Sequence, residues 1–140
     1  MEKIHIGVAG VEVREVPQDE AHTVLAAISR SPVFCVLPPA SYAKILAYVR
    51  LAQVRAGLTL VRKGERPSAL FMVVRGGLLV SGERERAGPG RVFGLTPSSR
   101  AAAPAEATIR MAADGVLAVI TADRLKSLVA EFPQLDSDEL

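Results

Sequence analysis

The sequence contains a single cysteine, Cys35, and only two histidines, His5 and His22. One cysteine cannot form a disulfide within the chain, and it cannot supply a cysteine-rich zinc site. A metal site inside a β-barrel enzyme needs two or three histidines and an acid that line the barrel. Both histidines precede the strand-rich part of the sequence, so such a site is excluded. We therefore expect no metal and no cofactor.

Long apolar segments and nucleotide-hydrolysing motifs are also missing. No run approaches the roughly 18 apolar residues that a membrane span requires. The first residues lack the basic start and apolar core of a secretion signal. There is no Gly-x-x-x-x-Gly-Lys-Ser/Thr loop, and no Ser-His or Cys-His pairing is indicated. These absences predict a cytoplasmic protein that is not an enzyme, with no catalytic residues and no membrane partner.

The net charge of +2 conceals an uneven distribution. Residues 41–100 contain eleven Lys or Arg side chains and three Glu, which gives this segment a net charge of +8. A basic segment attracts phosphate groups or nucleic acid. Arginine also serves as the solvated face of surface strands, and the sequence leaves both interpretations open.

Two stretches near the N-terminus alternate apolar and polar side chains. Residues 4–8 and 11–16 show the period of half-buried strands. Ala9 and Gly10 between them are predicted to turn a hairpin. The sequence thus predicts a strand extension over residues 1–17, which adds to a sheet edge of the same chain or of a second copy.

Two helices are predicted next. Residues 17–30 carry one apolar stripe at helical spacing, and Pro32 is expected to end this helix. A second helix is expected to begin at Pro38 and Pro39, because proline is tolerated at the first helical position. Cys35 lies between the two helices among apolar neighbours, which predicts a small residue of the core.

From Arg50 onward the sequence changes to short apolar strands that alternate with turns rich in glycine. This pattern favours an antiparallel sandwich or barrel. Gly64, Gly77 and Gly94 are predicted where a strand reverses, because glycine takes a positive φ without steric cost. The predicted fold class is mostly β, an antiparallel β-roll or jelly roll with N-terminal helices and a short C-terminal helix.

Several of these residues have the spacing of a known family. Residues 88–94 read Gly-Pro-Gly-Arg-Val-Phe-Gly. They are similar to the Gly-x-Gly-x-x-Phe-Gly entry to the phosphate-binding cassette of the cyclic nucleotide-binding domain family. The preceding residues that resemble this family are Gly57, Leu60, Gly64, Glu65, residues 70–74, Gly76 or Gly77, and Val80. The resemblance continues through residues 107–111 and 115–120, similar to the last two roll strands, and residues 121–129, similar to the helix after the roll.

The resemblance covers roughly residues 20–135 and implies a β-roll that follows one or two helices. It predicts a cyclic nucleotide-binding-like domain over residues 18–133, with an acidic tail over residues 134–140. Transcription regulators of this family carry a long helix and a helix-turn-helix after the roll. The residues that follow Phe132 leave no room for these elements, so no DNA-binding domain is expected.

The resemblance also implies where a ligand would bind. In the family, a Glu directly after Phe-Gly accepts the ribose hydroxyl, and an Arg just before the Ala-Thr of the next strand meets the phosphate. Here these positions hold Leu95 and Ala105, and Glu106 stands beside the second. The loss of one charged partner from a desolvated site costs about 2–5 kcal/mol. The resemblance therefore implies a divergent member that lacks the usual cassette Glu and Arg.

If the pocket does bind a ligand, the candidate residues are Gly94, Leu95, Thr96, Arg100 and Thr108. Backbone N–H groups of the loop would face the anion. Arg100 lies within the cassette loop and is the cation that could replace the missing arginine. The alternative interpretation is that Arg100 is a loop residue exposed to solvent.

Three functions are compatible with the sequence. The first is a regulatory or scaffolding module that binds a protein partner or a second copy of itself, forming a homodimer through its N-terminal strands, and does not bind cyclic AMP or cyclic GMP. The second is a small-molecule sensor with a rebuilt pocket for a cyclic nucleotide, a cyclic dinucleotide or another anion. The third is nucleic-acid binding through the basic segment, whose affinity would fall steeply with salt.

Overall fold

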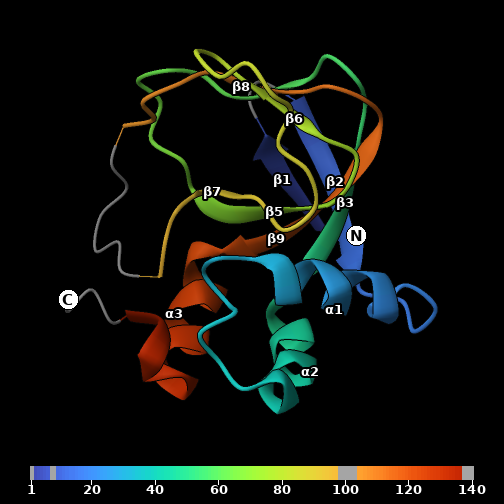
Figure 1. Cartoon of the computed structure of the whole chain (residues 1–140), viewed down its shortest axis with the longest axis vertical. Helices are drawn as coiled ribbons and strands as arrows, with labels where there is room; N and C mark the ends of the chain where they lie inside the picture. Colours follow the sequence, from blue (N-terminus) through green and yellow to red (C-terminus); the bar gives the residue numbers. More distant parts are fainter. Residues whose placement is uncertain (1, 7–8, 98–103, 137–140) are drawn as a thin grey trace.

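The computed structural model describes residues 2–6, 9–97 and 104–136, and these form three layers (Figure 1). Sheet A has six strands in the order β1-β2-β3-β9-β5-β7, and sheet B has three strands in the order β4-β8-β6. All strand pairs are antiparallel. The helices cover the face of sheet A that is turned away from sheet B (Figure 1). The predicted fold class, an antiparallel β-roll with flanking helices, is confirmed.

The elements have the following bounds. The strands are β1 (Glu2–Ile6), β2 (Ala9–Glu15), β3 (Arg50–Val54), β4 (Thr59–Val61), β5 (Ala69–Arg75), β6 (Leu78–Val80), β7 (Val92–Gly94), β8 (Ile109–Met111) and β9 (Gly115–Thr121). The α-helices are α1 (Ala21–Arg30), α2 (Tyr42–Ile45) and α3 (Ala122–Glu131). Three 3-10 helices accompany them, η1 (Pro39–Ser41), η2 (Leu46–Tyr48) and η3 (Pro133–Asp136).

Strands β5 and β9 are buried on both faces, which explains their nearly continuous apolar sequences. Successive side chains of a strand point to opposite faces. On β5, Phe71 and Val73 therefore pack between the two sheets, whereas Leu70 and Met72 pack against the helices. Sheet A thus separates two apolar clusters, the roll interior on one side and the helix-side core on the other.

The N-terminal extension continues sheet A. Strands β1 and β2 form the predicted hairpin, but Ala9 and Gly10 belong to β2, where Ala9 pairs with Ile6. The prediction that Ala9 and Gly10 form the turn is therefore wrong. Strand β2 pairs in turn with β3 through Val13 and Ala52. The extension therefore adds to the roll of its own chain, and β1 forms an edge of the sheet.

Ion pairs also hold the extension to the roll. Glu20, just before α1, lies 2.8 Å from Arg14 of β2 and 3.2 Å from Arg75 of β5. The contact with Arg75 is a hydrogen bond, whereas Glu20 Oε2 has no hydrogen-bond partner in the described part of the chain and contacts Arg14 through charge alone. The Glu20 side chain is 18% exposed, and one carboxylate thus links two strands distant in sequence.

We expect Glu20→Gln to lower the free energy of unfolding by about 1 kcal/mol, because two partly exposed ion pairs lose their charge. Chemical denaturation measures this difference. Glu15→Gln is the matched control, since Glu15 is 85% exposed and lies 4.0 Å from Arg50. Equal effects of the two substitutions would contradict the proposed role of Glu20.

Four local predictions need correction. The first helix begins at Ala21 rather than at Pro17, because residues 18–20 form a turn. The second helix does begin near Pro39, but it is divided into η1, α2 and η2. Gly76, not Gly77, has a positive φ, of 91°. The predicted acidic tail covers residues 134–140, but residues 134–136 lie in η3, where Leu135 is buried in the helix-side core.

Cys35 is exposed, so the prediction that it belongs to the core is wrong. Residues 32–36 form consecutive turns, in which the Cys35 N–H donates to the Ser31 carbonyl. In turns of this kind, side chains three residues apart share a face. Phe34 and Leu37 therefore enter the core together, and Cys35 faces solvent.

Tyr48 of η2 connects the N-terminal helices to the C-terminal helix. Its hydroxyl donates a hydrogen bond to Glu131 Oε1 at the end of α3. This hydrogen bond, with smaller contributions from desolvation and from the charge of Glu131, raises the pKa of the Tyr48 phenol above its ordinary value. The contact favours the neutral phenol.

Because the pKa is raised in the folded state, the stabilisation is complete below the ordinary tyrosine pKa of about 10 and is lost as pH rises through the raised value. In a Tyr42→Phe background, Tyr48 is the remaining tyrosine, and its ultraviolet titration should have a midpoint above about 10. Adding Glu131→Ala should lower this midpoint. Identical midpoints with and without Glu131 would contradict the assignment.

None of the helices in the described part of the chain has the length and apolar character that crossing a membrane requires.

Candidate functional site

The candidate ligand loop begins at the end of β7. Phe93 of β7 stacks on Phe71 of β5 in the roll interior, with ring centroids 5.0 Å apart. Gly94 follows with a φ of 92°, and a Cβ at this position would collide with the Ala69 carbonyl oxygen. The Leu95 N–H then donates to the same carbonyl at 2.9 Å. Glycine is therefore required here by the backbone of the roll itself.

The two positions at which the resemblance places charged groups face different layers. Leu95 is half-buried and packs against the helix-side core. Ala105 is half-buried and packs against the roll interior. Its backbone is held to the β4–β5 turn, because the Gly64 N–H donates to Ala105 and the Ala105 N–H donates to Glu65. Glu106, the next residue, is exposed.

Thr108 holds the strands of sheet B together. Its hydroxyl accepts a hydrogen bond from the Lys63 N–H at 3.1 Å, and its own N–H donates to Ser81 Oγ at 2.9 Å. Gly94 and Leu95 are bound to sheet A, whereas Thr108 joins the strands of sheet B. Thr96 is exposed. Arg100 lies outside the described residues, so its predicted role stays a prediction.

The roll interior is apolar throughout the described part of the chain. The buried polar side chain found among the described residues is that of Ser31. It lies at the end of α1 and not in the roll interior. The buried residues of the interior are Val13, Ala52, Val54, Leu60, Val61, Ala69, Phe71, Val73, Leu78, Val80, Ala87, Phe93, Met111, Leu117 and Val119. The buried side chains of this interior that the structure describes offer no charge to an anionic ligand.

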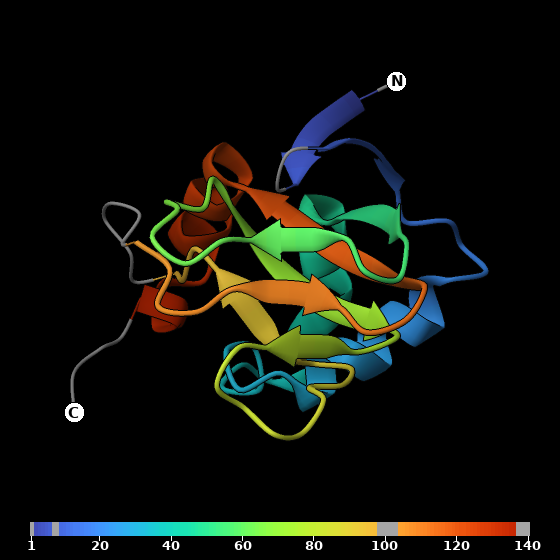
Figure 2. The same cartoon turned by 90° about the horizontal axis from the view of Figure 1, so that it is seen from above.

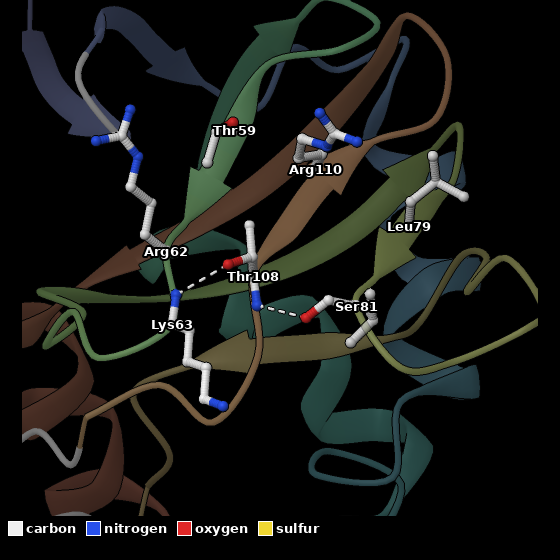
Figure 3. A pocket seen from close by; sticks show the side chains of 8 residues that line it. Thr59, Arg62, Lys63, Leu79, Ser81, Thr108 and Arg110 are labelled. Atoms are coloured by element: carbon white, nitrogen blue, oxygen red, sulfur yellow. Dashed lines mark hydrogen bonds between the residues drawn. The ribbon is translucent and has the colours of Figure 1, made fainter.

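A hollow of about 420 Å³ lies on the outer face of sheet B (Figure 3). Figure 2 shows the three strands of this sheet in front of sheet A. We call this hollow the outer basic hollow; its lining residues are Thr59, Arg62, Lys63, Leu79, Val80, Ser81, Thr108 and Arg110. A second hollow, of about 350 Å³, lies among β2, α1 and η2 and is lined by both Glu15 and Arg50.

Sequence reasoning found the basic excess of residues 41–100 but not the outer basic hollow. Arg110 lies outside that segment and pairs across the sheet with Thr59 of β4 and Leu79 of β6. Only the strand register brings it into the same hollow as Arg62 and Lys63. Arg91, which belongs to the basic segment, forms an ion pair with Glu83 at 3.0 Å instead.

Together, the two antiparallel sheets, the helix layer on one face and the Phe-Gly turn before the loop define a helix-covered β-roll domain. The family model described as the cyclic nucleotide-binding domain matches residues 51–132. The chain belongs to the cyclic nucleotide-binding domain family. No curated protein is similar enough in sequence to count as a relative.

Solved structures show the same fold. A cyclic nucleotide-binding domain from Methylobacillus flagellatus is 16% identical with a TM-score of 0.69, and the match covers 90% of this chain and 75% of that one. The regulatory domain of Toxoplasma gondii PKA with cAMP is 21% identical with a TM-score of 0.68, over 84% of this chain and 48% of that one. The Thermus thermophilus catabolite activator protein is 21% identical with a TM-score of 0.64, over 75% of this chain and 53% of that one.

Proposed function

We propose that this chain is a non-catalytic regulatory or scaffolding module of the cyclic nucleotide-binding domain family, and that its roll does not bind cyclic AMP or cyclic GMP. The apolar roll interior is the observation that carries this proposal. In the described part of the chain, no charged side chain is buried there. Ala105, the position at which the resemblance implies the family's phosphate-binding arginine, packs against this interior.

The energetic argument follows from the charge of the ligand. A cyclic nucleotide would bring a phosphate and several ribose oxygens into an apolar space. An ionised group that leaves water without a partner loses far more hydration energy than packing returns. The absence of one charged partner alone weakens a desolvated pair by about 2–5 kcal/mol, which is several factors of ten in affinity.

A thermal-shift assay tests the proposal with cyclic AMP, cyclic GMP, a cyclic dinucleotide and inorganic phosphate. A ligand present at a hundred times its Kd stabilises a protein by about 2.7 kcal/mol, which raises the Tm measurably. We expect no rise for the parent protein. Ala105→Arg restores the family cation and should make the Tm respond to a cyclic nucleotide, whereas Ala105→Gln, similar in size but neutral, should not.

A Tm rise of the parent with a cyclic nucleotide would overturn the proposal. A rise with only the dinucleotide or phosphate would support a sensor with a rebuilt pocket instead.

The proposed module requires a partner, and self-association is one form of it. Strand β2 is already paired with β3, so a second copy would pair with the outer edge of β1. An unpaired edge strand presents backbone donors and acceptors to another chain. Sedimentation equilibrium should then show a dimer whose population rises with concentration. A monomer at every concentration would exclude self-association and leave a different protein as the partner.

A further inference from the structure

The strand residues Thr59, Leu79 and Arg110 of the outer basic hollow alternate along their strands with residues of the roll interior. On β6, Leu78 and Val80 are buried, whereas Leu79 between them is 43% exposed. On β8, Arg110 precedes the buried Met111 and faces outward in the same way. Figure 3 shows Arg62 and Lys63 on the β4 side, Leu79 on the β6 side, and Arg110 between them. These side chains therefore face away from the roll interior.

Hydrogen bonds fix the floor of the outer basic hollow before anything binds. Thr108 accepts from the Lys63 N–H and donates to Ser81 Oγ, and the Ser81 N–H donates back to the Thr108 carbonyl at 2.9 Å. These contacts join the chain at the ends of β4, β8 and β6. A surface that is already ordered loses little conformational entropy on binding.

The three cations of the hollow are not neutralised by neighbours. Arg62, Lys63 and Arg110 are exposed, and their side chains form no ion pair with any residue that the structure describes. The nearest acidic residue in sequence, Glu65, accepts a hydrogen bond from the Arg62 backbone N–H at 2.8 Å. Among the described residues that line the hollow, none carries a carboxylate. The surface thus presents three positive charges to one side of an exposed leucine.

We propose that the outer basic hollow docks an acidic, extended peptide segment of a partner protein, in which carboxylates lie to one side of an apolar residue. Carboxylates would accept hydrogen bonds from Arg110 and Arg62, whose guanidinium groups suit paired acceptors. The apolar residue would cover Leu79. Among the described residues, Leu79 and Val36 are the large hydrophobic residues that are exposed. Thr59 and Ser81 line the same hollow and would lie beside the peptide backbone.

A peptide fits this surface better than a nucleic acid does. Single-stranded nucleic acids bind through aromatic side chains on which their bases stack. The lining of the hollow, as far as the structure describes it, contains no aromatic residue. Phosphate contacts alone give weak binding that falls steeply with salt. An inorganic anion would neutralise the cations but would leave Leu79 uncovered.

The inference gives the partner chemistry of the proposed interaction module and rests on that proposal for its biological role. The binding itself is measured on the outer face and does not depend on whether the roll interior accepts a nucleotide. Absence of peptide binding would overturn this inference, whereas a Tm rise with a cyclic nucleotide would overturn only the proposed function.

Fluorescence anisotropy of a labelled peptide, in which a run of glutamates lies to one side of a leucine, tests the docking surface at physiological ionic strength. We expect saturable binding to the whole chain, and about tenfold weaker binding to Arg62→Gln/Arg110→Gln, because two exposed charge contacts are lost. The matched control, Lys44→Gln/Lys126→Gln, removes two exposed charges from α2 and α3 on the other side of sheet A. It should change the Kd by less than about twofold.

Three results would overturn the proposal. The first is absence of saturable binding to the parent protein. The second is equal affinity for a peptide with glutamine in place of every glutamate, or equal weakening by the control variant. The third is equally effective competition by an oligouridylate of the same charge, which would show that the surface recognises charge alone. Circular dichroism spectra of the variants that match the parent establish that the substitutions leave the fold intact.

Discussion

Replacing Gly94 by alanine is expected to lower the free energy of unfolding by about 2–4 kcal/mol. The φ of 92° is rarely adopted by residues with a side chain, and the added Cβ would collide with the Ala69 carbonyl. The Leu95 N–H donates to this same carbonyl, so relief of the collision would disturb the pairing of β7 with β5. Denaturant unfolding of the two proteins measures the difference.

Gly57→Ala separates the two causes. Gly57 has a φ of 84°, but nothing lies within 4 Å of an added Cβ. Only the conformational cost, about 1–2 kcal/mol, should therefore be measured for this variant. If Gly94→Ala costs no more than Gly57→Ala, the close approach between Gly94 and Ala69 is not what demands the glycine.

Phe71→Ala is expected to cost about 3–5 kcal/mol of unfolding free energy. The ring is 3% exposed and stacks on Phe93 between the two sheets, so its removal loses both apolar burial and the ring–ring contact. Phe71→Leu keeps most of the apolar volume and should cost less than half as much. Loss of under about 1 kcal/mol for the alanine variant would show that the interior collapses around the gap and is not closely packed.

The strands and their arrangement in a roll could be predicted from the sequence because local signals agree there. Short apolar segments, glycines at reversals such as Gly64 and Gly94, and the Phe-Gly turn all indicate the same antiparallel roll. The two-sided burial of β5 and β9 likewise follows from their continuous apolar sequences.

The remaining features depend on contacts between distant residues. Cys35 has apolar neighbours in sequence, but the turns around it bury Phe34 and Leu37 instead. The resemblance predicts that Leu95 and Ala105 stand in place of charged groups, whereas their packing on opposite sides of sheet A depends on the folded roll. The outer basic hollow requires the register that places Arg110 beside Leu79, which no local pattern specifies.

Calorimetric titration of the purified chain with cyclic AMP and cyclic GMP tests the central claim most directly. An apolar interior without a buried cation in its described part predicts heats of dilution alone, at ligand concentrations well above those that saturate a micromolar site. Saturable one-to-one binding of either nucleotide with a micromolar Kd would contradict it.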